Sequence, residues 1–315
     1  MPPPPTVLIL GVGHWGQTLS YLFRKQGCTV RLWGRSQGPL NQDWFENIQL
    51  VVSALPIKAV RDVAQAIATL QLSPNLTLVS ATKGLEADTF STAADIWQCY
   101  CPQHPLVVLS GPNLAAELQQ GLPAAAVVGG EAIATQRVQD ALGSATFRLY
   151  SNEDRRGVEM GGIFKNVIAI ACGVNDSLGL GINARSALIT RGLVEMVRVG
   201  SHWGGEVSTF YGLSGLGDLL ATCTSPLSRN YQVGWHLGQG KSLPQALDLT
   251  HGTAEGVNTA LVLYRYAQQH DLEIPITAMV AAVLQGQLTP QAALGHLLER
   301  PFKPETHPMT NAPLP

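Results

Sequence analysis

Charged side chains are scarce in this chain. Asp, Glu, Lys and Arg make up 13% of its 315 residues, and the formal net charge is −2. A chain with so few charges and so small a net charge gives no indication of an extended basic surface. We therefore expect no nucleic-acid or membrane-surface partner. No apolar run approaches the roughly 18 residues of a membrane span. The Met-Pro-Pro-Pro-Pro start lacks the pattern of a signal peptide. We therefore expect a soluble protein of the cytoplasm.

Cysteine is also scarce, with five residues and no Cys-x-x-Cys pair. Cys28 and Cys172 lie in apolar stretches, which is typical of reduced cysteines rather than of disulfides or zinc ligands. The sequence therefore predicts a reducing compartment and no metal site. Internal repeats are absent too, and the length is sufficient for two domains.

A glycine motif stands near the N-terminus. The apolar run 7–10 leads into GVGHWG at positions 11–16, and a helical pattern follows. In such a strand–turn–helix unit, Gly11 permits the tight turn and Gly13 lets the backbone approach a pyrophosphate. Gly16 lets the helix pack close to the strand, and the N–H groups at the helix start face the phosphates. With a second strand pattern at 29–33, we predict a dinucleotide-binding unit.

The residues after the second strand bear on the cofactor. An NAD-preferring domain usually carries an Asp or Glu there, about 20 residues past the first glycine, for the ribose 2′-hydroxyl. This chain has Gly34-Arg35-Ser36 and no acid before Asp43. Arg35 can pair with a 2′-phosphate and stack on the adenine, or it can be a solvated surface arginine. We predict that NADP is preferred and that NAD is the second option.

Strand and helix patterns alternate through the first half of the chain. Helical patterns at 58–70, 90–97 and 131–142 lie between several strand patterns, which predicts a mainly parallel, doubly wound sheet. Only about 15 residues separate Arg35 from the strand at Leu50. That is too few for a full helix and an extra strand, so we expect a trimmed adenine side. The expected strands are 7–10, 29–33, 50–54, 76–80, 106–109, 125–128 and 147–150.

The pattern changes near residue 151. The stretch 153–173 predicts one long helix whose second half is apolar all round, which is typical of a buried helix. We predict a Rossmann-like dinucleotide-binding domain over 1–151 and an all-helical domain over 152–315, with a loose proline-rich tail from about residue 303. Further helical patterns lie at 186–199, 253–270, 278–285 and 290–298.

Lys165 is the most informative single residue. It lies within the stretch GGIFKNVIAI at 161–170. Burial without a partner favours the neutral amine and lowers the pKa, which suits proton exchange near neutral pH. Gly161 and Gly162 each cost the helix about 1 kcal/mol relative to Ala, which makes sense if another group approaches the backbone closely. The alternative is a structural lysine that pairs with Glu159 or reaches water.

Two further segments follow predicted strands. They therefore belong at the carboxyl edge of the sheet, where doubly wound folds bind ligands. Lys83 follows the strand 76–80, and the alternative for it is an ordinary loop lysine. Ser110-Gly111-Pro112-Asn113 follows the next strand, with a helix beginning at Ala115. This segment is a candidate nest of backbone donors, although Ser-Gly-Pro is also a common turn.

A third cluster lies at 212–230. Asp218 ends the segment GLSGLGD, and a lone Asp at such a place usually caps or charge-complements a helix start. Ser228-Arg229-Asn230 places a hydroxyl, a guanidinium and an amide side by side at a helix start. That combination suits a phosphate group. The alternative is a Ser N-cap followed by surface residues.

Taken together, these motifs resemble bacterial NAD(P)-dependent glycerol-3-phosphate dehydrogenases. The resemblance runs from Val7 to about Ala260 and is carried by eight motifs in order. It implies NAD(P)H-dependent, reversible reduction of dihydroxyacetone phosphate to sn-glycerol 3-phosphate, which supplies glycerophospholipid synthesis, and it implies a homodimer. The motifs are GVGHWG, LWGR, SATKG, SGPNLAAEL, GVEMGGIFKNVIAIACG, ALITRGLVEM, GLSGLGDLLATCTSPLSRN and AEGVNTA.

The resemblance also implies roles for individual residues. Lys165 would donate and accept the proton. The residues lining the glycerol phosphate would be Lys83, Gly111, Lys165, Asp218, Ser228, Arg229 and Asn230. Besides the three motif glycines, the residues contacting the dinucleotide would be Trp15, Arg35, Lys83, Ala115, Arg229 and Glu255. The chain departs from the family in its shorter 35–50 segment, and at 176–183 it reads DSLGLGIN where the family usually reads DGLGLGDN.

Two other interpretations fit parts of the sequence. A 3-hydroxyacid or 6-phosphogluconate-type dehydrogenase also joins a Rossmann domain to a helical domain with a lysine on a buried helix. Ser228-Arg229-Asn230 together with the GLGD segment separates this chain from them. A non-catalytic NADP-responsive binding protein would use the same glycine motif without turnover, and it leaves the buried Lys165 unexplained.

Overall fold

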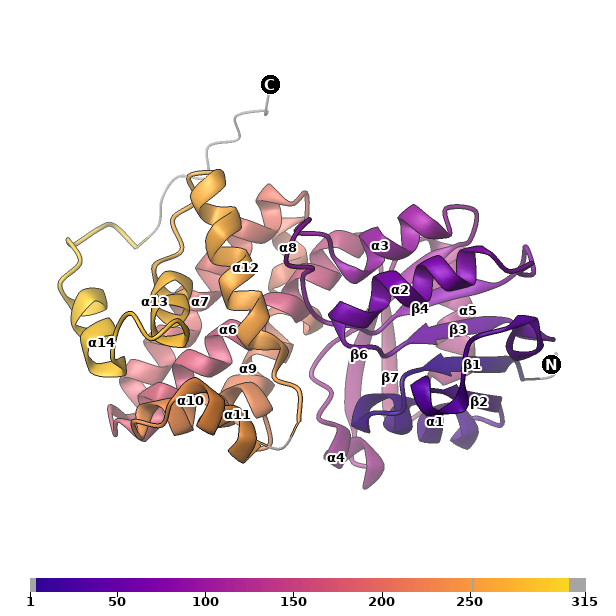
Figure 1. Cartoon of the computed structure of the whole chain (residues 1–315), viewed down its shortest axis with the longest axis horizontal. Helices are drawn as coiled ribbons and strands as arrows, with labels where there is room; N and C mark the ends of the chain where they lie inside the picture. Colours follow the sequence, from indigo (N-terminus) through magenta and orange to yellow (C-terminus); the bar gives the residue numbers. More distant parts are fainter. Residues whose placement is uncertain (1–3, 251, 306–315) are drawn as a thin grey trace.

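A sheet with its covering helices lies beside a second group of helices (Figure 1). The computed structural model describes residues 4–250 and 252–305, and the account of the fold concerns these residues. Within them, all strands lie between Thr6 and Asn152, and only helices follow from Arg155. The predicted fold class, a Rossmann-like doubly wound unit followed by an all-helical region, is confirmed.

The described strands form one seven-stranded sheet in the order β2-β1-β3-β4-β5-β6-β7. Neighbouring strands are parallel except β5 and β6, which are antiparallel. Because parallel strands end at the same edge, the loops after β1, β3, β4 and β5 meet there. The bounds are β1 Thr6–Leu10, β2 Thr29–Trp33, β3 Leu50–Ser53, β4 Thr77–Ser80, β5 Leu106–Ser110, β6 Ala124–Gly129 and β7 Phe147–Asn152.

Helices cover both faces of the sheet. Leu8 and Leu10 of β1 pack toward α2 and α3, whereas Val7 and Ile9 pack toward α1 and α5. This alternation follows from the two-residue period of a strand. The helices are α1 His14–Lys25, α2 Ile57–Ala68, α3 Ala93–Tyr100, α4 Ala115–Gln119 and α5 Ala132–Leu142.

Two details of the sheet part depend on short segments. Between β2 and β3 lie only two short 3-10 helices, η1 Arg35–Gln37 and η2 Gln42–Phe45, so the trimmed adenine side is confirmed.

The helix predicted from residue 90 begins at Ala93 instead. Phe90 has a left-handed φ of 59°, which a helix excludes. Thr92 Oγ1 accepts a hydrogen bond from Asp95 N at 3.1 Å and caps the first turn.

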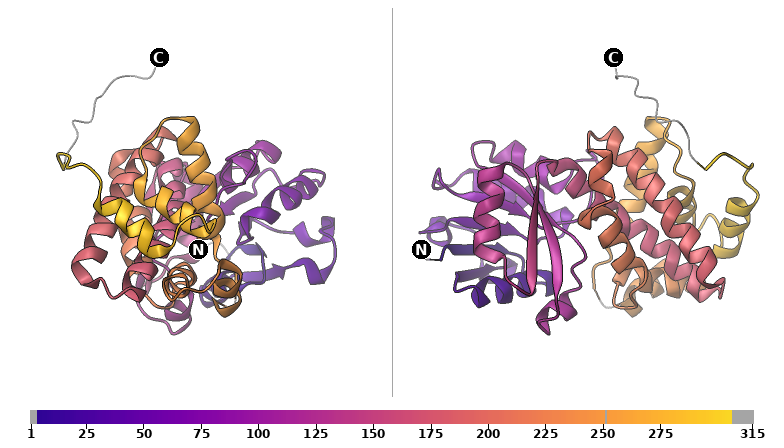
Figure 2. Two further views of the ribbon diagram at one scale, coloured as in Figure 1. Left: turned by 60° about the vertical axis from the view of Figure 1, so that its left-hand side comes forward. Right: turned by 180° about the vertical axis from the view of Figure 1, so that it is seen from behind.

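The helical part is built around α6, Arg155–Ser177. Figure 2 shows the two parts from two further sides. Sequence patterns missed α8, α11 and the single π-helical turn η3, which are short. The remaining elements are α7 Gly181–His202, α8 Val207–Phe210, η3 Leu213–Gly217, α9 Asp218–Cys223, α10 Arg229–Gly238, α11 Leu243–Thr250, α12 Glu255–Gln269, α13 Pro275–Leu284 and α14 Pro290–Leu298.

Helix α6 corrects one expectation. By length and composition alone it could cross a membrane, so the expectation that no apolar run approaches that length is wrong. The fold explains its apolar character, because 89% of its most apolar stretch is buried by other parts of the protein. It is the core helix predicted from the 153–173 pattern. Most of the tail expected from residue 303 lies outside the described residues.

Candidate active site

The glycine motif forms a tight turn at the carboxyl end of β1. Gly11 has a φ of 119°, and a Cβ there would lie 2.6 Å from Ala54 O. A Cβ on Gly16 would lie 1.9 Å from Gly11 O, so α1 packs directly on the turn. Around Gly13, by contrast, no atom lies within 4 Å of the Cβ position among the described residues. The turn is therefore crowded toward the sheet and open toward the ligand side, as a pyrophosphate cradle requires.

Lys165, Lys83 and Asp218 meet in one cluster, which we call the Lys–Asp–Lys cluster. Lys165 Nζ donates to Asp218 Oδ1 at 2.5 Å, and Lys83 Nζ donates to Asp218 Oδ2 at 2.6 Å. The Asp218 side chain is 1% exposed and the Lys165 side chain 11%. Asp218 therefore shares its charge between two ammonium groups, one from the sheet edge and one from the core helix.

The pKa of Lys165 is lowered from 10.5 to about 8, and burial is the largest cause. Lys83 lowers it further, while the Asp218 carboxylate opposes the shift. The sequence-based expectation of a lowered pKa rested on burial without a partner. The structure provides a partner, and burial still dominates. The alternative pairing with Glu159 is wrong, because Glu159 Oε1 accepts from Ala94 N at 2.9 Å on α3.

Gly161 and Gly162 on α6 allow close approach from two sides. A Cβ on Gly161 would lie 2.7 Å from Ser214 O in the π-helical turn η3. A Cβ on Gly162 would lie 2.3 Å from Ser110 Oγ, and Lys83 Cε lies 3.4 Å from the same point. The turn η3 ends at Gly217, directly before Asp218. The glycine pair therefore lets η3 and Lys83 reach α6 and places Asp218 beside Lys165.

The segment 228–230 begins α10, as predicted. Ser228 is the N-cap, and its Oγ accepts from Tyr231 N at 3.3 Å. Asn230 is buried: its Nδ2 donates to Asn166 Oδ1 at 2.9 Å, and its Oδ1 accepts from Gly256 N at 2.9 Å. Arg229 is exposed and lies against Gly252, whose Cβ position is 3.0 Å from Arg229 Nη1. The N-cap alternative thus holds for Ser228, but Asn230 is not a surface residue.

Glu255 joins the two parts of the molecule. It begins α12, and one of its carboxylate oxygens lies 3.3 Å from the Cβ position of Gly84 in the loop after β4. Burial raises its pKa, while the Ile57 N–H and the charges of Lys58 and Arg229 oppose the shift. This residue from the helical part therefore borders the edge of the sheet where the dinucleotide is predicted.

The other predicted residues lie around the same edge. Gly111 has a φ of 142°, and a Cβ there would meet Ala126 Cα at 2.9 Å. Ala115 begins α4, and Trp15 is half-buried in the first turn of α1. Arg35 is exposed on η1. Its neighbour Gly34 lies against Val12 of the glycine motif, with the Cβ position 2.8 Å from the valine methyl groups. Arg35 therefore stands close to the predicted pyrophosphate turn.

Two polar side chains at this edge were not assigned a role from the sequence. Within the described part of the chain, Ser110 Oγ and both amide atoms of Asn113 are buried without a hydrogen-bond partner. Buried polar atoms without a protein partner are rare, so these atoms are available to a ligand at this edge. The sequence predicts a nest of backbone donors in this segment and gives no role to its side chains. An amide and a hydroxyl after a strand end were the available signal.

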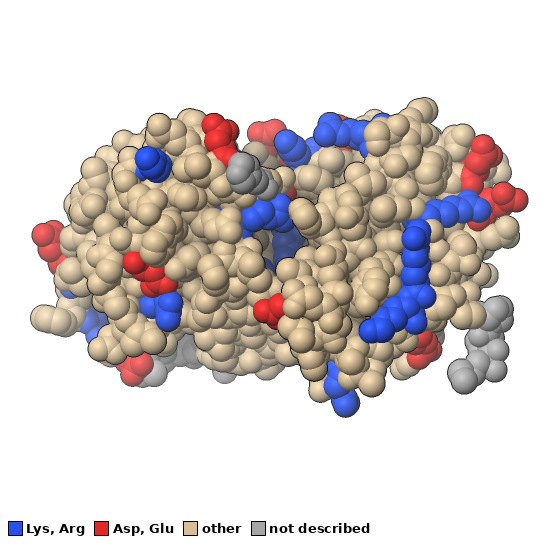
Figure 3. Space-filling model, turned by 90° about the horizontal axis from the view of Figure 1, so that it is seen from below, with Lys and Arg blue, Asp and Glu red and all other residues tan. Residues whose placement is uncertain are grey.

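The face between the two parts is hollowed. Figure 3 shows this hollow near the middle of the molecule, with Lys and Arg side chains at its edge and deeper inside. A positive hollow is suited to an anionic ligand, since low-polarity walls concentrate the field of the charges inside. Paired and buried groups in such a site are typical of acid–base chemistry.

Comparison with known proteins decides the family. The family model described as NAD-dependent glycerol-3-phosphate dehydrogenase C-terminus matches residues 154–295, and the corresponding N-terminus model matches residues 40–136. The chain belongs to the NAD-dependent glycerol-3-phosphate dehydrogenase family. It is therefore an NAD(P)-dependent oxidoreductase, as the sequence motifs predicted.

Individual members of the family cover nearly the whole chain. A protein of Thermosynechococcus vestitus named glycerol-3-phosphate dehydrogenase [NAD(P)+] is 78% identical over 304 residues, 96% of this chain and 99% of its own length. One of the same name from Trichormus variabilis is 54% identical over 95% of this chain and 98% of its own. The crystal structure of the Coxiella burnetii glycerol-3-phosphate dehydrogenase is 33% identical, with a TM-score of 0.88 over 95% of this chain and 100% of that one.

Proposed function

We propose that the chain catalyses the reversible reduction of dihydroxyacetone phosphate to sn-glycerol 3-phosphate, with NADPH preferred over NADH. The observation that carries this proposal is the Lys–Asp–Lys cluster at the carboxyl edge of a dinucleotide-binding sheet. The product would supply glycerophospholipid synthesis. Family membership and the assembled cluster leave the hydroxyacid dehydrogenase and sensor interpretations without an observation in their favour.

The residues present fit a nicotinamide dinucleotide. The turn 11–16 is open on its ligand side, and Ser110 and Asn113 hold buried polar atoms without partners among the described residues. When bound, the reduced nicotinamide supplies a hydride for C2 of the substrate. Gly11, Gly13 and Gly16 would hold the pyrophosphate. The further contacts would come from Trp15, Arg35, Lys83, Ala115, Arg229 and Glu255.

Lys165 is the proposed acid. In the reduction, its Nζ gives a proton to the oxygen on C2 as that oxygen gains negative charge, and takes the proton back in the reverse reaction. A pKa of about 8 leaves the amine mostly protonated at neutral pH and still able to release the proton. Asp218 holds both ammonium groups in place, and Lys83 adds positive charge beside the developing alkoxide.

The phosphate end of the substrate would bind at the start of α10. Ser228, Arg229 and Asn230 bring donors there, and the helix start adds its own N–H groups and dipole. Gly111 would border the glycerol moiety from the sheet side. Binding energy at the phosphate, away from the reacting carbon, aligns C2 with the cofactor and with Lys165.

The organisation of the protein is part of the proposal. We assign residues 1–151 to a dinucleotide-binding domain and 152–315 to a helical substrate domain. We further propose a homodimer that acts in the cytoplasm. The low net charge of −2 and the burial of the apolar helix α6 support a soluble enzyme.

The first test is absorbance at 340 nm with dihydroxyacetone phosphate, run in parallel with NADPH and NADH. We expect rapid oxidation, with the higher kcat/KM for NADPH. Faster use of NADH would overturn the preference and leave the reaction standing. If neither cofactor is oxidised by protein that still binds NADPH, the proposed reaction is wrong.

A second test addresses the phosphate end. Arg229→Ala removes an exposed guanidinium, and a hydrogen bond between charged groups contributes about 1.5–3 kcal/mol. We expect the KM for dihydroxyacetone phosphate to rise about 10- to 100-fold, with a smaller change in kcat. An unchanged KM would remove Arg229 from the phosphate site.

A further inference from the structure

The segment that carries Lys83 belongs to the sheet part in sequence and to the helical part in packing. It spans residues 81–92 between β4 and α3, and we call it the β4–α3 segment. Leu85 of this segment is fully buried in the hydrophobic core around α6, and Phe90 packs against the same core. The ring of Phe90 meets that of Tyr266 on α12 edge to face, with the centroids 5.5 Å apart. The segment is therefore packed on the helical part.

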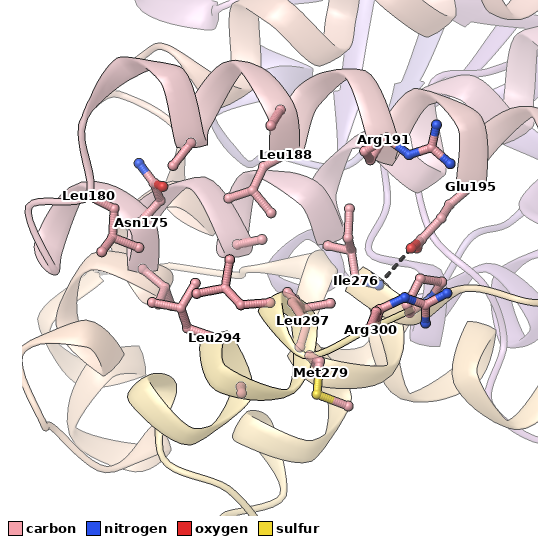
Figure 4. Close-up of a pocket in the computed structure, with 18 of the residues that line it drawn as sticks. Asn175, Leu180, Leu188, Arg191, Glu195, Ile276, Met279, Leu294, Leu297 and Arg300 are labelled. Atoms are coloured by element: carbon pink, nitrogen blue, oxygen red, sulfur yellow. Dashed lines mark hydrogen bonds between the residues drawn. The ribbon is translucent and has the colours of Figure 1, made fainter. Parts of the chain in front are cut away.

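Elsewhere in the helical part, side chains join helices to one another. Glu195 of α7 accepts from Ile276 N at 2.6 Å and from Thr277 N at 3.0 Å, at the first turn of α13. Figure 4 shows the first of these bonds. By contrast, Asn258 of α12 donates from Nδ2 to the Leu85 carbonyl at 2.7 Å. The bond of Asn258 therefore crosses from the helical part to the segment that follows β4.

Lys83 lies between two anchors of different origin. On its N-terminal side, Thr82 Oγ1 donates to Leu55 O at 2.9 Å, in the loop after β3. On its C-terminal side, the Leu85 carbonyl accepts the bond from Asn258. A single residue separates Lys83 from Leu85, so a shift of the second anchor displaces the backbone of the lysine.

The Asn258 bond is the better protected of two links from α12. Arg265 also donates to the segment, to Ala87 O at 2.5 Å, but that contact is exposed. Asn258 is half-buried and Leu85 is fully buried. Loss of the amide donor takes a partner from a buried carbonyl, which is unfavourable unless the carbonyl moves toward another donor or water. Removal of the Asn258 amide should therefore displace the segment.

We propose that Asn258 is a positioning residue for Lys83. Its bond to Leu85 O holds the β4–α3 segment against α12, and the segment in turn keeps Lys83 Nζ at 2.6 Å from Asp218 Oδ2. This inference rests on the reaction proposed above, in which Lys83 adds positive charge beside the developing alkoxide. The lysine thus comes from the sheet part, and helix α12 sets its place.

The charge of Lys83 also acts on Lys165, which provides a measurable signature. Burial lowers the pKa of Lys165 most, Lys83 lowers it further, and the Asp218 carboxylate opposes the shift. Cys223 of α9 interacts with the same groups, but burial raises the pKa of its thiol well above the ordinary value, so the thiol stays neutral near pH 8. When Lys83 moves away from Asp218, the pKa of Lys165 should therefore rise.

The first test compares the pH dependence of kcat/KM in wild type and Asn258→Leu. Leucine keeps the branched shape of asparagine and removes the donor. We expect kcat/KM at pH 7 to fall about tenfold, because displacement of Lys83 weakens the charge beside the alkoxide without removing it. The loss relative to wild type should be at least about twofold smaller at pH 9 than at pH 7, because the basic limb moves to higher pH.

The matched control is Gln268→Leu on the same helix. Gln268 is exposed, and its amide donates to Tyr264 Oη on α12 itself rather than to the segment. This variant should keep the wild-type kcat/KM and pH profile. Leucine and alanine both favour a helix more than asparagine does, so α12 should stay folded, and Asn258→Ala should give the same result as Asn258→Leu.

A titration without substrate separates this inference from the proposed reaction. The chain contains six lysines, so lysine labelled with 13C at Cε gives a simple NMR spectrum, in which the Lys165 signal is the one lost in Lys165→Met. The midpoint of this signal should rise in Asn258→Leu and in Lys83→Met. Once Lys83 is replaced, adding Asn258→Leu should cause no further rise, because the effect passes through Lys83.

Each outcome decides the proposal. A midpoint that rises in Asn258→Leu, stays in Gln268→Leu and rises no further in the double variant supports it. An unmoved midpoint in Asn258→Leu overturns it, as does a further rise in the double variant. If wild type does not reduce dihydroxyacetone phosphate but the midpoints move as expected, the proposed reaction is wrong and the positioning of Lys83 stands.

Discussion

The sheet part and the helical part contribute to the active site by different means. The sheet part supplies loops, in which Gly11 and Gly111 adopt left-handed φ values and expose backbone groups. The helical part supplies side chains from the faces of packed helices, among them Lys165 and Asn230. The loop glycines act through backbone conformation and close packing, whereas a side chain in a packed wall takes on the low polarity of that wall. Recognition of a common cofactor suits the first arrangement, and proton transfer suits the second.

Burial in the helical part affects carboxyl groups in the same way. Glu195 of α7 and Glu159 of α6 are both buried, and burial raises the pKa of each to about 7. Each accepts backbone N–H groups at the start of another helix, which opposes the shift without cancelling it. Among the described residues of the helical part, burial therefore moves the pKa of Lys165, Glu159 and Glu195 toward neutral pH.

Replacement of Lys165 should have the largest effect on activity. Lys165→Ala removes the acid from the helical wall and leaves the cofactor loops intact. We expect kcat to fall roughly 10²–10⁴-fold, with NADPH binding retained. The control is Lys241→Ala, an exposed lysine after α10 that should keep full activity. Steady-state kinetics and fluorescence titration with NADPH check both, and near-normal turnover in Lys165→Ala would refute its role.

Glu195 tests the effect of burial on stability. Its pKa is raised from 4.5 to about 7, so its contribution to the free energy of unfolding is full below pH 4.5 and is lost as pH rises through about 7. The shift corresponds to about 3 kcal/mol, or about 10² in the folding constant. Glu195→Gln should therefore remove that part of the pH dependence.

Urea unfolding at pH 5 and pH 8 measures the effect of Glu195→Gln as a difference from wild type. The exposed Glu46 provides the control, since Glu46→Gln should leave the wild-type difference between the two pH values unchanged. Equal pH dependence in Glu195→Gln and wild type would contradict the assignment.

The pH dependence of kcat/KM tests whether Asp218 acts on Lys165. With a Lys165 pKa of about 8, kcat/KM for the reduction should fall about tenfold per pH unit above that value. The Asp218 carboxylate opposes the lowered pKa of Lys165, so Asp218→Asn should move this limb to lower pH. Relative to wild type at the same pH, the loss of kcat/KM in the variant should be at least tenfold greater at pH 9 than at pH 6. A limb that stays at pH 8 would mean that Asp218 does not act on Lys165.

Substitution of Arg35, in the sheet part, should have the smallest effect, and this effect is on cofactor preference. Arg35→Ala removes an exposed guanidinium, and solvent weakens such a pair. We expect the ratio of kcat/KM for NADPH over NADH to fall about tenfold, with kcat nearly unchanged. The control is Arg24→Ala, which removes another exposed arginine of the sheet part, one that donates to Val30 O near the start of β2. A constant ratio in Arg35→Ala would place the preference elsewhere.

The sequence predicted the elements whose patterns are local. The glycine motif, the alternating strands and the apolar stretch around Lys165 each carry their own periodicity, and the structure contains all of them. The turn η3 and helix α11 were missed for a physical reason. The segment GLSGLG reads as a loop because glycine disfavours helices, and the π-helical turn packs against Phe210 of α8 and Gly161 of α6, the second of which lies outside any local pattern.

The role of Asp218 depends on contacts that no local pattern contains. It was interpreted from sequence as a helix cap, and the family resemblance added it to the substrate site. Its bonds reach Lys165 and Lys83, which are 53 and 135 residues away in the chain. The wrong pairing of Lys165 with Glu159 has the same origin. Nearness in sequence suggested it, but six residues along a helix turn the two side chains to different faces.

The shared carboxylate of Asp218 gives the site two charge states. With both lysines protonated, the cluster carries one net positive charge, which attracts a substrate that bears a phosphate. In the proposed reduction Lys165 gives its proton to the product, after which the same three groups sum to zero and the attraction for the equally phosphorylated product weakens. By this mechanism, each reduction would lower the affinity of the site for its own product. Reprotonation of Lys165 from solvent would restore the positive charge of the cluster before the next substrate molecule binds.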